Sequence, residues 1–381
     1  MRIHRIAVTA FFFMSGFTHA NWASRLPQLE TFLSISHAEL GTLLFVMAIG
    51  ALLAMPFTGW LAYRFGSDKV CLFTAILLCV STSLIALQTN IYVEGMILFL
   101  IGFANGSMDV AMNEQAVLVE REYKKPIMSS FHAFWSIGMA SGAGSGALFS
   151  RFDVPLSTHL LIVSVIALLG FVYFSTRLIK NANEGASKPA SSFLLPSKAI
   201  IPLGLIAFCG MLSEGSMLDW SAIYVNEVVG SSKTMGAVAF GVFGAAMTTG
   251  RLIGDYLTAR LGKKRLLVLD SILAISGLTI ILIFPVMPLT TIGLFLAGLG
   301  LSTIVPIVYT TAGNMPGISP SVGIAMATTI GYSGFFVGPP TIGFVGENYG
   351  LRTGLFFTLL LLFIMFALIA KERFSYSEKA G

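Results

Sequence analysis

The sequence predicts an all-α membrane protein, with twelve transmembrane helices in two six-helix halves. Of its 381 residues, 55% are hydrophobic and only 11% are charged, and the mean hydropathy is +0.84. In soluble proteins about a quarter of all residues are charged, so most of the surface of this protein must face lipid. The apolar runs are continuous and lack an alternation of period two. This favours helices over a β-barrel, because a helix satisfies its own backbone hydrogen bonds in lipid.

The second half of the chain repeats the first. A repeat of roughly half the chain, with several spans in each copy, is the organisation expected of secondary transporters. At a shift of 196 positions identical residues coincide: Leu61, Arg64 and Gly66 with Leu257, Arg260 and Gly262; Phe99, Leu100 and Gly102 with Phe295, Leu296 and Gly298; Gly138 and Gly142 with Gly334 and Gly338.

Twelve apolar runs are close to the length needed to cross a hydrocarbon core, which is about 20 residues. Arg2 and Arg5, ahead of the first run, also fit a cleaved signal peptide. A first span keeps the repeat complete, because the seventh run occupies the same place in the second half. The predicted spans are 6–24, 38–62, 70–88, 93–119, 127–149, 156–179, 199–226, 235–258, 265–284, 287–312, 321–345 and 351–370.

These runs divide the chain into an N-terminal six-helix half at 1–180, a cytoplasmic linker at 181–198 and a C-terminal six-helix half at 199–381. The linker is rich in small residues and Pro. With both termini in the cytoplasm, 18 of the 23 Lys and Arg residues fall on the inner side. This bias predicts an N-in, C-in, multi-pass protein of the cell (inner) membrane. The net charge of +5 then belongs to the lipid-facing inner surface, and we expect no nucleic acid partner.

The connections after the second and eighth spans share a short motif. Gly59 to Lys69 reads GWLAYRFGSDK, and Tyr256 to Arg265 reads YLTARLGKKR. In each, an arginine ends a helix, where it can meet exposed carbonyls and the negative end of the helix dipole, and a glycine permits a sharp reversal. Both motifs, the span count and the central linker resemble the major facilitator superfamily. The resemblance covers the whole chain and implies a transporter.

Gating residues are expected around these motifs. The superfamily usually places an acid directly before the motif arginine, but Tyr63 and Ala259 stand there. In the eighth span an arginine and an acid one helical turn apart can supply a substitute. For the loop cations the alternative is a role in topology alone. The gating candidates are Arg64, Arg251, Asp255, Arg260 and Asp219, the last nearer the outer side as an outer gate or a packing group.

The fourth span carries the clearest polar pattern. Gly106 to Glu114 reads GSMDVAMNE, which is similar to the fucose permease branch, where an acid is followed four residues later by Asn. Here these are Asp109 and Asn113. The usual Pro after the Asn is Glu114, and the first span lacks the acid of fucose permease.

An ionised side chain at mid-bilayer costs about 2.5 to 3.5 kcal/mol, so Asp109 needs a reason to be there. Asn105, Asp109 and Asn113 are four residues apart and share one helix face, which we expect to face the central cavity. Asp109 is the first proton-coupling candidate, and Asn105 and Asn113 are substrate-binding candidates. The alternative is a structural acid that locks neighbouring helices.

Three other spans contribute candidates. Glu214, near the middle of the seventh, is the second proton-coupling candidate, while Trp220 in the seventh and Asn21 in the first are substrate-binding candidates. A Trp near the interface is also a common anchor. In the fifth span a shared face suggests a cavity wall, with a satisfied structural histidine as the alternative; its substrate-binding candidates are His132, Trp135 and Ser136.

These features predict a secondary active transporter that moves a small polar organic solute, including sugar-like ones, by proton-coupled symport and alternating access. The rival is a proton-driven exporter of amphiphilic compounds or drugs, favoured by 31 Phe and 17 Met. Enzyme and receptor form a third class. With no nucleophile motif and no metal-ligand pattern, we expect no enzyme activity, metal or cofactor. The expected partners are the small-molecule substrate, protons and the lipid bilayer, for a monomeric chain.

Overall fold

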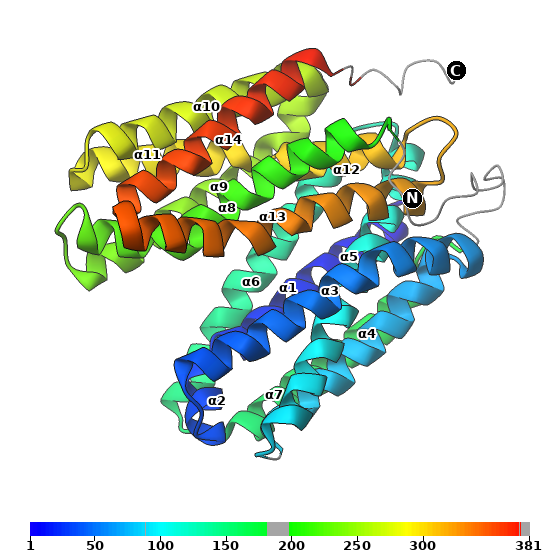
Figure 1. The fold of residues 1–381 in the computed structure, drawn as a ribbon. Coiled ribbons are helices and arrows are strands. Elements are labelled where there is room, and N and C mark those ends of the chain that lie inside the picture. Colours follow the sequence, from blue (N-terminus) through cyan, green and yellow to red (C-terminus); the bar gives the residue numbers. More distant parts are fainter. Residues whose placement is uncertain (88, 181–197, 373, 375–381) are drawn as a thin grey trace. The chain divides into compact units, whose positions relative to one another are not determined.

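The computed structural model describes residues 1–381 except 88, 181–197, 373 and 375–381. Nearly all of the predicted linker at 181–198 therefore lies outside the described residues. The described residues form fourteen α-helices and no strand, which confirms the all-helical prediction (Figure 1). They divide into two compact units.

Unit 1 comprises Met1–Lys124, Phe131–Leu194 and Gly317–Ala325. It follows the first half of the chain, except that it includes the first turns of a helix from the second half. Its helices are α1 (Arg2–Ala23), α2 (Leu26–Leu33), α3 (His37–Phe65), α4 (Ser67–Leu84), α5 (Ile91–Tyr123), most of α6 (Met128–Arg151), α7 (Leu156–Ser175) and the start of α13 (Pro320–Tyr349).

Unit 2 comprises Lys125–Ser130, Leu195–Pro316 and Met326–Gly381. In the same way, it takes the first residues of α6 from the first half of the chain. Its other helices are α8 (Ile201–Glu227), α9 (Lys233–Leu261), α10 (Lys263–Ile283), α11 (Met287–Leu301), α12 (Ile304–Gly313), most of α13 and α14 (Leu351–Lys371).

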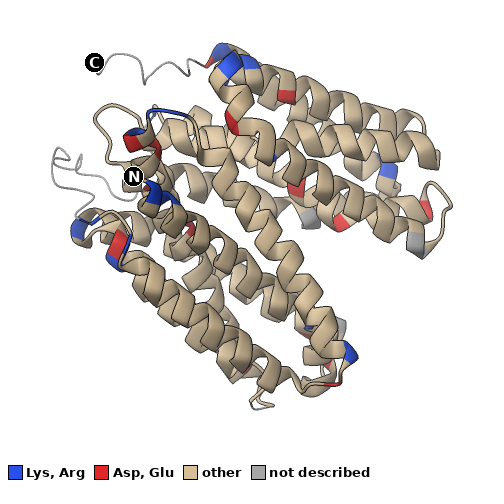
Figure 2. Ribbon diagram, turned by 180° about the vertical axis from the view of Figure 1, so that it is seen from behind, with Lys and Arg blue, Asp and Glu red and all other residues tan. Residues whose placement is uncertain are grey.

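Within the described part, ten helical segments are long and apolar enough to cross a membrane, with α11 and α12 counted as one run, Met287–Gly313. Helices α1 and α6, at the predicted first and fifth spans, are of similar length but fall outside this set. The number of twelve crossings and the N-in, C-in orientation stay predictions. Figure 2 shows that charged residues gather near the ends of the long helices and leave most of their middles uncharged.

The helix boundaries follow from local capping. Ser36 and Glu39 form a capping box at the start of α3, in which the Ser36 amide donates to Glu39 Oε2 at 2.8 Å. Gly66 (φ 93°) and Gly262 (φ 78°) end α3 and α9 and directly precede α4 and α10. Such positive φ values favour glycine, and the sharp reversals predicted at both positions are confirmed.

Two features differ from the predicted elements. The connection between the first two spans contains the short helix α2, which has only eight residues and follows Arg25. The tenth predicted span, 287–312, is not continuous, because the helix breaks at Ser302 and Thr303 between α11 and α12. Pro306 gives the physical reason, since proline has no amide hydrogen to donate to the carbonyl four residues earlier and its ring crowds that carbonyl.

Close helix contacts in each unit depend on glycine. A methyl group on Gly102 of α5 would overlap the Met47 carbonyl of α3, and one on Gly298 of α11 would lie 2.7 Å from the Phe243 carbonyl of α9. On α6, a methyl group on Gly138 would overlap the Phe13 carbonyl of α1. Small residues let transmembrane helices approach closely in this way.

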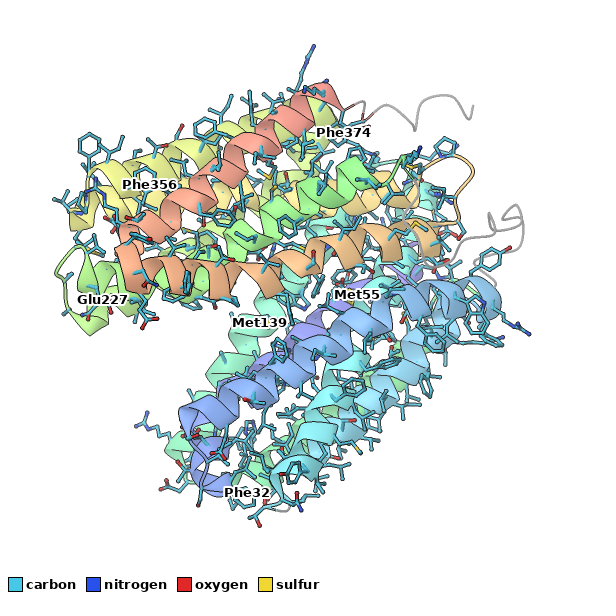
Figure 3. All side chains as sticks on the ribbon, in the orientation of Figure 1. Phe32, Met55, Met139, Glu227, Phe356 and Phe374 are labelled. Carbon is cyan, nitrogen blue, oxygen red and sulfur yellow. The ribbon has the colours of Figure 1, made fainter. Side chains whose placement is uncertain are left out.

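The outer surfaces of both units are apolar. Figure 3 labels Phe32 of unit 1 and Phe356 of unit 2, whose side chains are 40% and 47% exposed. Met55, also labelled, is fully buried in unit 1. Exposed phenylalanines on a helical unit with few charges are expected where lipid is the solvent.

Candidate functional site

The candidate site in unit 1 is a hydrogen-bonded chain of three side chains. Asn113 Nδ2 donates to Asp109 Oδ1 at 3.1 Å and to the Asp109 carbonyl at 2.8 Å, within α5. Asn113 Oδ1 lies 3.2 Å from His132 Nε2 of α6. Because the amide oxygen can only accept, His132 Nε2 carries the hydrogen in this bond. The structure therefore brings together three of the residues nominated from sequence.

The surroundings of this chain are mostly apolar and buried. Asn113 is completely buried and His132 is 8% exposed, and the Phe12 ring of α1 meets the imidazole edge-on, with ring centroids 5.2 Å apart. Ser136 Oγ donates to the His132 carbonyl at 3.2 Å. A carboxyl, an amide and an imidazole linked in this way can hold a proton and can exchange hydrogen bonds with a polar ligand.

Asn105 and Trp135 flank the chain in sequence. Asn105 is half-buried on α5, two helical turns before Asn113, and its Nδ2 has no hydrogen-bond partner among the described residues. Trp135 is half-buried on α6, and its backbone carbonyl packs against Gly16 of α1. Asn105 thus supplies a donor that the described part of the chain leaves unused.

Asn21 lies in a different buried cluster of unit 1. Its Oδ1 accepts from Ser145 Oγ at 2.6 Å and lies 2.9 Å from His159 Nε2. The other His159 nitrogen, Nδ1, lies 3.3 Å from Arg25 NH1, and Arg25 NH2 donates to the Val154 carbonyl at 3.0 Å. Burial lowers the pKa of the Arg25 guanidinium. This network ties the ends of α1 and α7 together and was not expected from the sequence.

Unit 2 contains a buried ion pair. Arg251 NH2 of α9 lies 3.1 Å from Glu214 Oε1 of α8, and the two side chains are 6% and 13% exposed. A buried pair of this kind holds two helices in register, and removal of either partner leaves a buried charge without its counterion. The sequence nominated both residues but did not pair them.

Asp219 and Trp220 lie further along α8. Asp219 is exposed, and Trp220 is half-buried with its indole beside Gly343 of α13. The Trp220 Nε1 atom is buried and has no hydrogen-bond partner among the described residues. The indole is therefore positioned by packing alone and keeps a donor for other use.

Asp255 of α9 binds the start of α6. Its Oδ1 accepts from the Ser129 amide at 2.8 Å and its Oδ2 from the Ser130 amide at 3.0 Å. Both amides belong to the first turn of α6, where backbone N–H groups lack helical partners and the helix dipole favours a negative charge. The carboxylate therefore caps a helix that lies more than a hundred residues away in sequence.

The two motif arginines are exposed and lie against aromatic rings of their own helices. The Arg64 guanidinium is 5.6 Å from the Trp60 ring centroid, and that of Arg260 is 4.7 Å from the Tyr256 ring centroid. Cation–π contacts at exposed sites are worth about 0.5–1 kcal/mol.

Glu114 and Asp270 are two of the four buried acids in the described structure that were not nominated from sequence, and the others are Glu94 and Glu120. Glu114 of α5 is completely buried, beside Ser67 and Ser321 of unit 1. Asp270 of α10 is 5% exposed and accepts a hydrogen bond from Thr303 Oγ1. In the 196-residue repeat, Asp270 of the second half coincides with the neutral Thr74 of the first half. This difference between the halves is the sequence signal that could have nominated Asp270. No group of three His, Cys, Asp or Glu side chains suited to a metal ion occurs in the part of the chain that is described.

Comparison with known proteins agrees with this architecture. The chain is 33% identical over 358 residues to an uncharacterized MFS-type transporter of Yersinia pestis, covering 94% of this chain and 93% of the relative. It is also 33% identical over 359 residues to the membrane protein MosC of Rhizobium meliloti, covering 93% of this chain and 86% of that protein.

Solved transporters share the fold at low sequence identity. FucP in its outward conformation matches with a TM-score of 0.78 at 14% identity, covering 96% of this chain and 97% of FucP. The human organic anion transporter MFSD10 matches with a TM-score of 0.75 at 16% identity, covering 97% of this chain and 99% of MFSD10. The family model "Major Facilitator Superfamily" matches residues 6–339. The chain therefore belongs to the major facilitator superfamily, whose members are multi-pass membrane transporters of small solutes.

Proposed function

We propose that this protein is a proton-coupled symporter of a small polar organic solute in the cell (inner) membrane, and that Asp109 carries the proton. The observation that supports this most is the Asp109–Asn113–His132 chain in unit 1. The likeness to FucP, which is the fucose:proton symporter of E. coli, agrees with a sugar-like solute. We take the protein to function as a monomer.

In the proposed cycle, the proton state of Asp109 sets what Asn113 and His132 offer to the solute. While Asp109 is ionised, Asn113 Nδ2 donates to its carboxylate. Protonation removes the charge that makes this bond strong, so the amide can turn to a solute hydroxyl. Asn105 Nδ2, which has no partner in the described structure, is a further donor. Ser136, Trp135, Trp220 and Asn21 complete or support the solute-binding surfaces.

Glu214 is the second proposed proton-coupling group. A proton on Glu214 would remove its charge and break the ion pair with Arg251. The packing of α8 on α9 would then change, which links proton binding in unit 2 to helix movement. A membrane potential alone supplies about 2.3 kcal/mol per elementary charge per 100 mV, which is enough to drive such a change.

For gating, we propose that the Asp255 cap on α6 is formed when the inner side is closed and is released when it opens. Arg64 and Arg260 would act at the same inner side through their loops, and Asp219, exposed on α8, would act at the outer side. The cap is the best supported of these roles, because one carboxylate joins two helices that belong to different halves of the chain.

The test is uptake by proteoliposomes under an imposed pH gradient, after a thermal-shift screen has identified a solute that stabilises the purified protein. We expect Asp109→Asn to lose accumulation against the solute gradient but to retain exchange of labelled for unlabelled solute. Asp153→Asn is the matched control. It makes the same chemical change at an exposed loop residue with φ 52°, a conformation that asparagine tolerates.

Full gradient-driven accumulation by Asp109→Asn would contradict the proton role. Loss of both accumulation and exchange would instead assign Asp109 to solute binding. Efflux of the solute driven by the proton gradient, with no uptake, would favour the exporter.

A further inference from the structure

The break between α11 and α12 is held from the side by one buried acid. Ser302 keeps helical angles (φ −61°, ψ −38°), whereas Thr303 turns to φ −105° and ψ −1°. Ser302 Oγ donates back to the Leu299 carbonyl at 2.6 Å. Thr303 Oγ1 donates to Asp270 Oδ2 of α10. Next to the break, a methyl group on Gly300 would overlap the Asp270 carbonyl. Helix α10 and the broken span are therefore in close contact at Asp270, as they are at Gly277 and Gly293.

The surroundings of Asp270 provide no counterion. Its side chain is 5% exposed, and, among the residues that the structure describes, no Lys, Arg or His forms an ion pair or hydrogen bond with it. The titratable or charged side chains described on the helices packed against α10 are Arg251, Asp255, Tyr256 and Arg260 on α9, Tyr309 on α12 and Arg352 and Lys371 on α14, with none on α11. On α10 itself the cations Lys263, Lys264 and Arg265 are all in the first turn.

An ionised carboxylate in this place would be a buried charge supported by one hydroxyl. Such a charge is costly in a membrane span, and removing a carboxylate from water without a cation costs several kcal/mol. A neutral carboxylic acid has no such penalty and still accepts the Thr303 hydrogen bond. The geometry thus favours a proton on Asp270.

The same break contacts the cap on α6. A methyl group on Gly254 of α9 would lie 2.7 Å from Thr303 Cγ2 and 2.8 Å from Ser129 Oγ. The Ser129 amide donates to Asp255 Oδ1 at 2.8 Å. All of these residues belong to unit 2. A shift of Thr303 would therefore reach Asp255 through a single glycine.

We propose that Asp270 is a third proton-binding site, neutral in this conformation, and that its proton sets the break between α11 and α12 against which Gly254 and the Asp255 cap pack. Release of the proton to water would leave a charge that draws water or a cation to the break and displaces Thr303. The site is separate from Asp109 and does not depend on which solute is transported.

Infrared spectroscopy of the purified full-length protein in lipid nanodiscs tests the proton directly, through the carbonyl stretch of protonated carboxylic acids. We expect Asp270→Asn to lose one component of this band at neutral pH. Thr303→Val should keep the component but move it to higher frequency, because the carboxyl loses a hydrogen bond. Glu227→Gln, an exposed acid at the end of α8, should leave the band unchanged.

An Asp270→Asn spectrum identical to that of the wild type would overturn the proposal. If that variant does not fold, Thr303→Val decides the matter alone, because an unshifted band contradicts a protonated Asp270 beside Thr303. The effect on the break is read from hydrogen exchange of the peptide around Ser302. At alkaline pH the wild type and Glu227→Gln should exchange faster there than Asp270→Asn, and equal rates would contradict control by this proton.

Discussion

The two halves of this transporter share their helix packing but not the acids within their membrane-spanning helices. Gly102 and Gly298 coincide in the 196-residue repeat, and both sit against a backbone carbonyl of a neighbouring helix. Asp109 coincides with Val305 and Asn113 with Tyr309, so the polar chain of α5 has no counterpart. The repeat therefore provides a common helical frame, and each half carries its own chemistry.

The second half breaks the symmetry in its own way. Asp270 coincides with Thr74, which bonds its own helix through the Val70 carbonyl at 2.9 Å. Asp255 coincides with Gly59, where a methyl group would lie 2.7 Å from Ala325 Cβ at the start of α13. One half thus caps a neighbouring helix with a carboxylate, and the other makes the equivalent contact by close apolar packing.

The largest effect is expected at the ion pair of unit 2. Arg251→Met leaves Glu214 buried without its cation, which should lower the free energy of unfolding by about 3–5 kcal/mol. Combining it with Glu214→Gln should restore most of this loss, because both buried charges are then removed. Denaturant unfolding in detergent micelles measures both values. A double variant no more stable than Arg251→Met would show that the pair is not what links α8 to α9.

The shared frame predicts similar losses at equivalent glycines. Gly102→Ala and Gly298→Ala each force a methyl group against a carbonyl, and overpacking of this kind costs about 1–3 kcal/mol. Gly144→Ala is the matched control, since nothing lies within 4 Å of the added methyl group. It should leave the unfolding free energy unchanged or slightly raised. A loss of unfolding free energy in only one of the two variants would show that the halves do not share this packing.

A smaller effect is expected at the cap of α6. Asp255→Ala removes the acceptor of two first-turn amides, and loss of a helix cap costs about 0.5–2 kcal/mol. Hydrogen exchange of the Ser129 and Ser130 amides should become faster, whereas Thr249→Ala, an exposed position on the same helix, should not change it. Unchanged exchange in Asp255→Ala would show that the carboxylate does not hold α6.

Much of the fold could be predicted from the sequence, because lipid imposes simple rules on length and hydrophobicity. The reversals at Gly66 and Gly262 follow from their place after a helix-ending arginine. The break in the tenth span also had a local signal, Pro306, although the long apolar run suggested one helix. Helix α2 was missed because an eight-residue segment is too short to stand out beside long membrane spans.

The site could be predicted only in part. The spacing of Asp109 and Asn113 places them on one face, and this contact is local. The bonds of Asn113 to His132 and of Arg251 to Glu214 join different helices, and no periodicity encodes which helices meet. Asp270 was missed because a lone acid in an apolar run has no local pattern. Only its partner Thr74 in the repeat distinguishes it.

The central claim is that proton coupling depends on Asp109, an acid with no counterpart in the second half. The most direct test of this claim is a measurement of proton movement. Proteoliposomes in weakly buffered medium are given the solute, and the external pH is recorded. The wild type and Asp153→Asn should make the medium more alkaline as proton and solute enter together. Asp109→Asn should give no pH change while it still exchanges labelled solute. An alkaline shift of wild-type size in Asp109→Asn would contradict the assignment of proton coupling to Asp109.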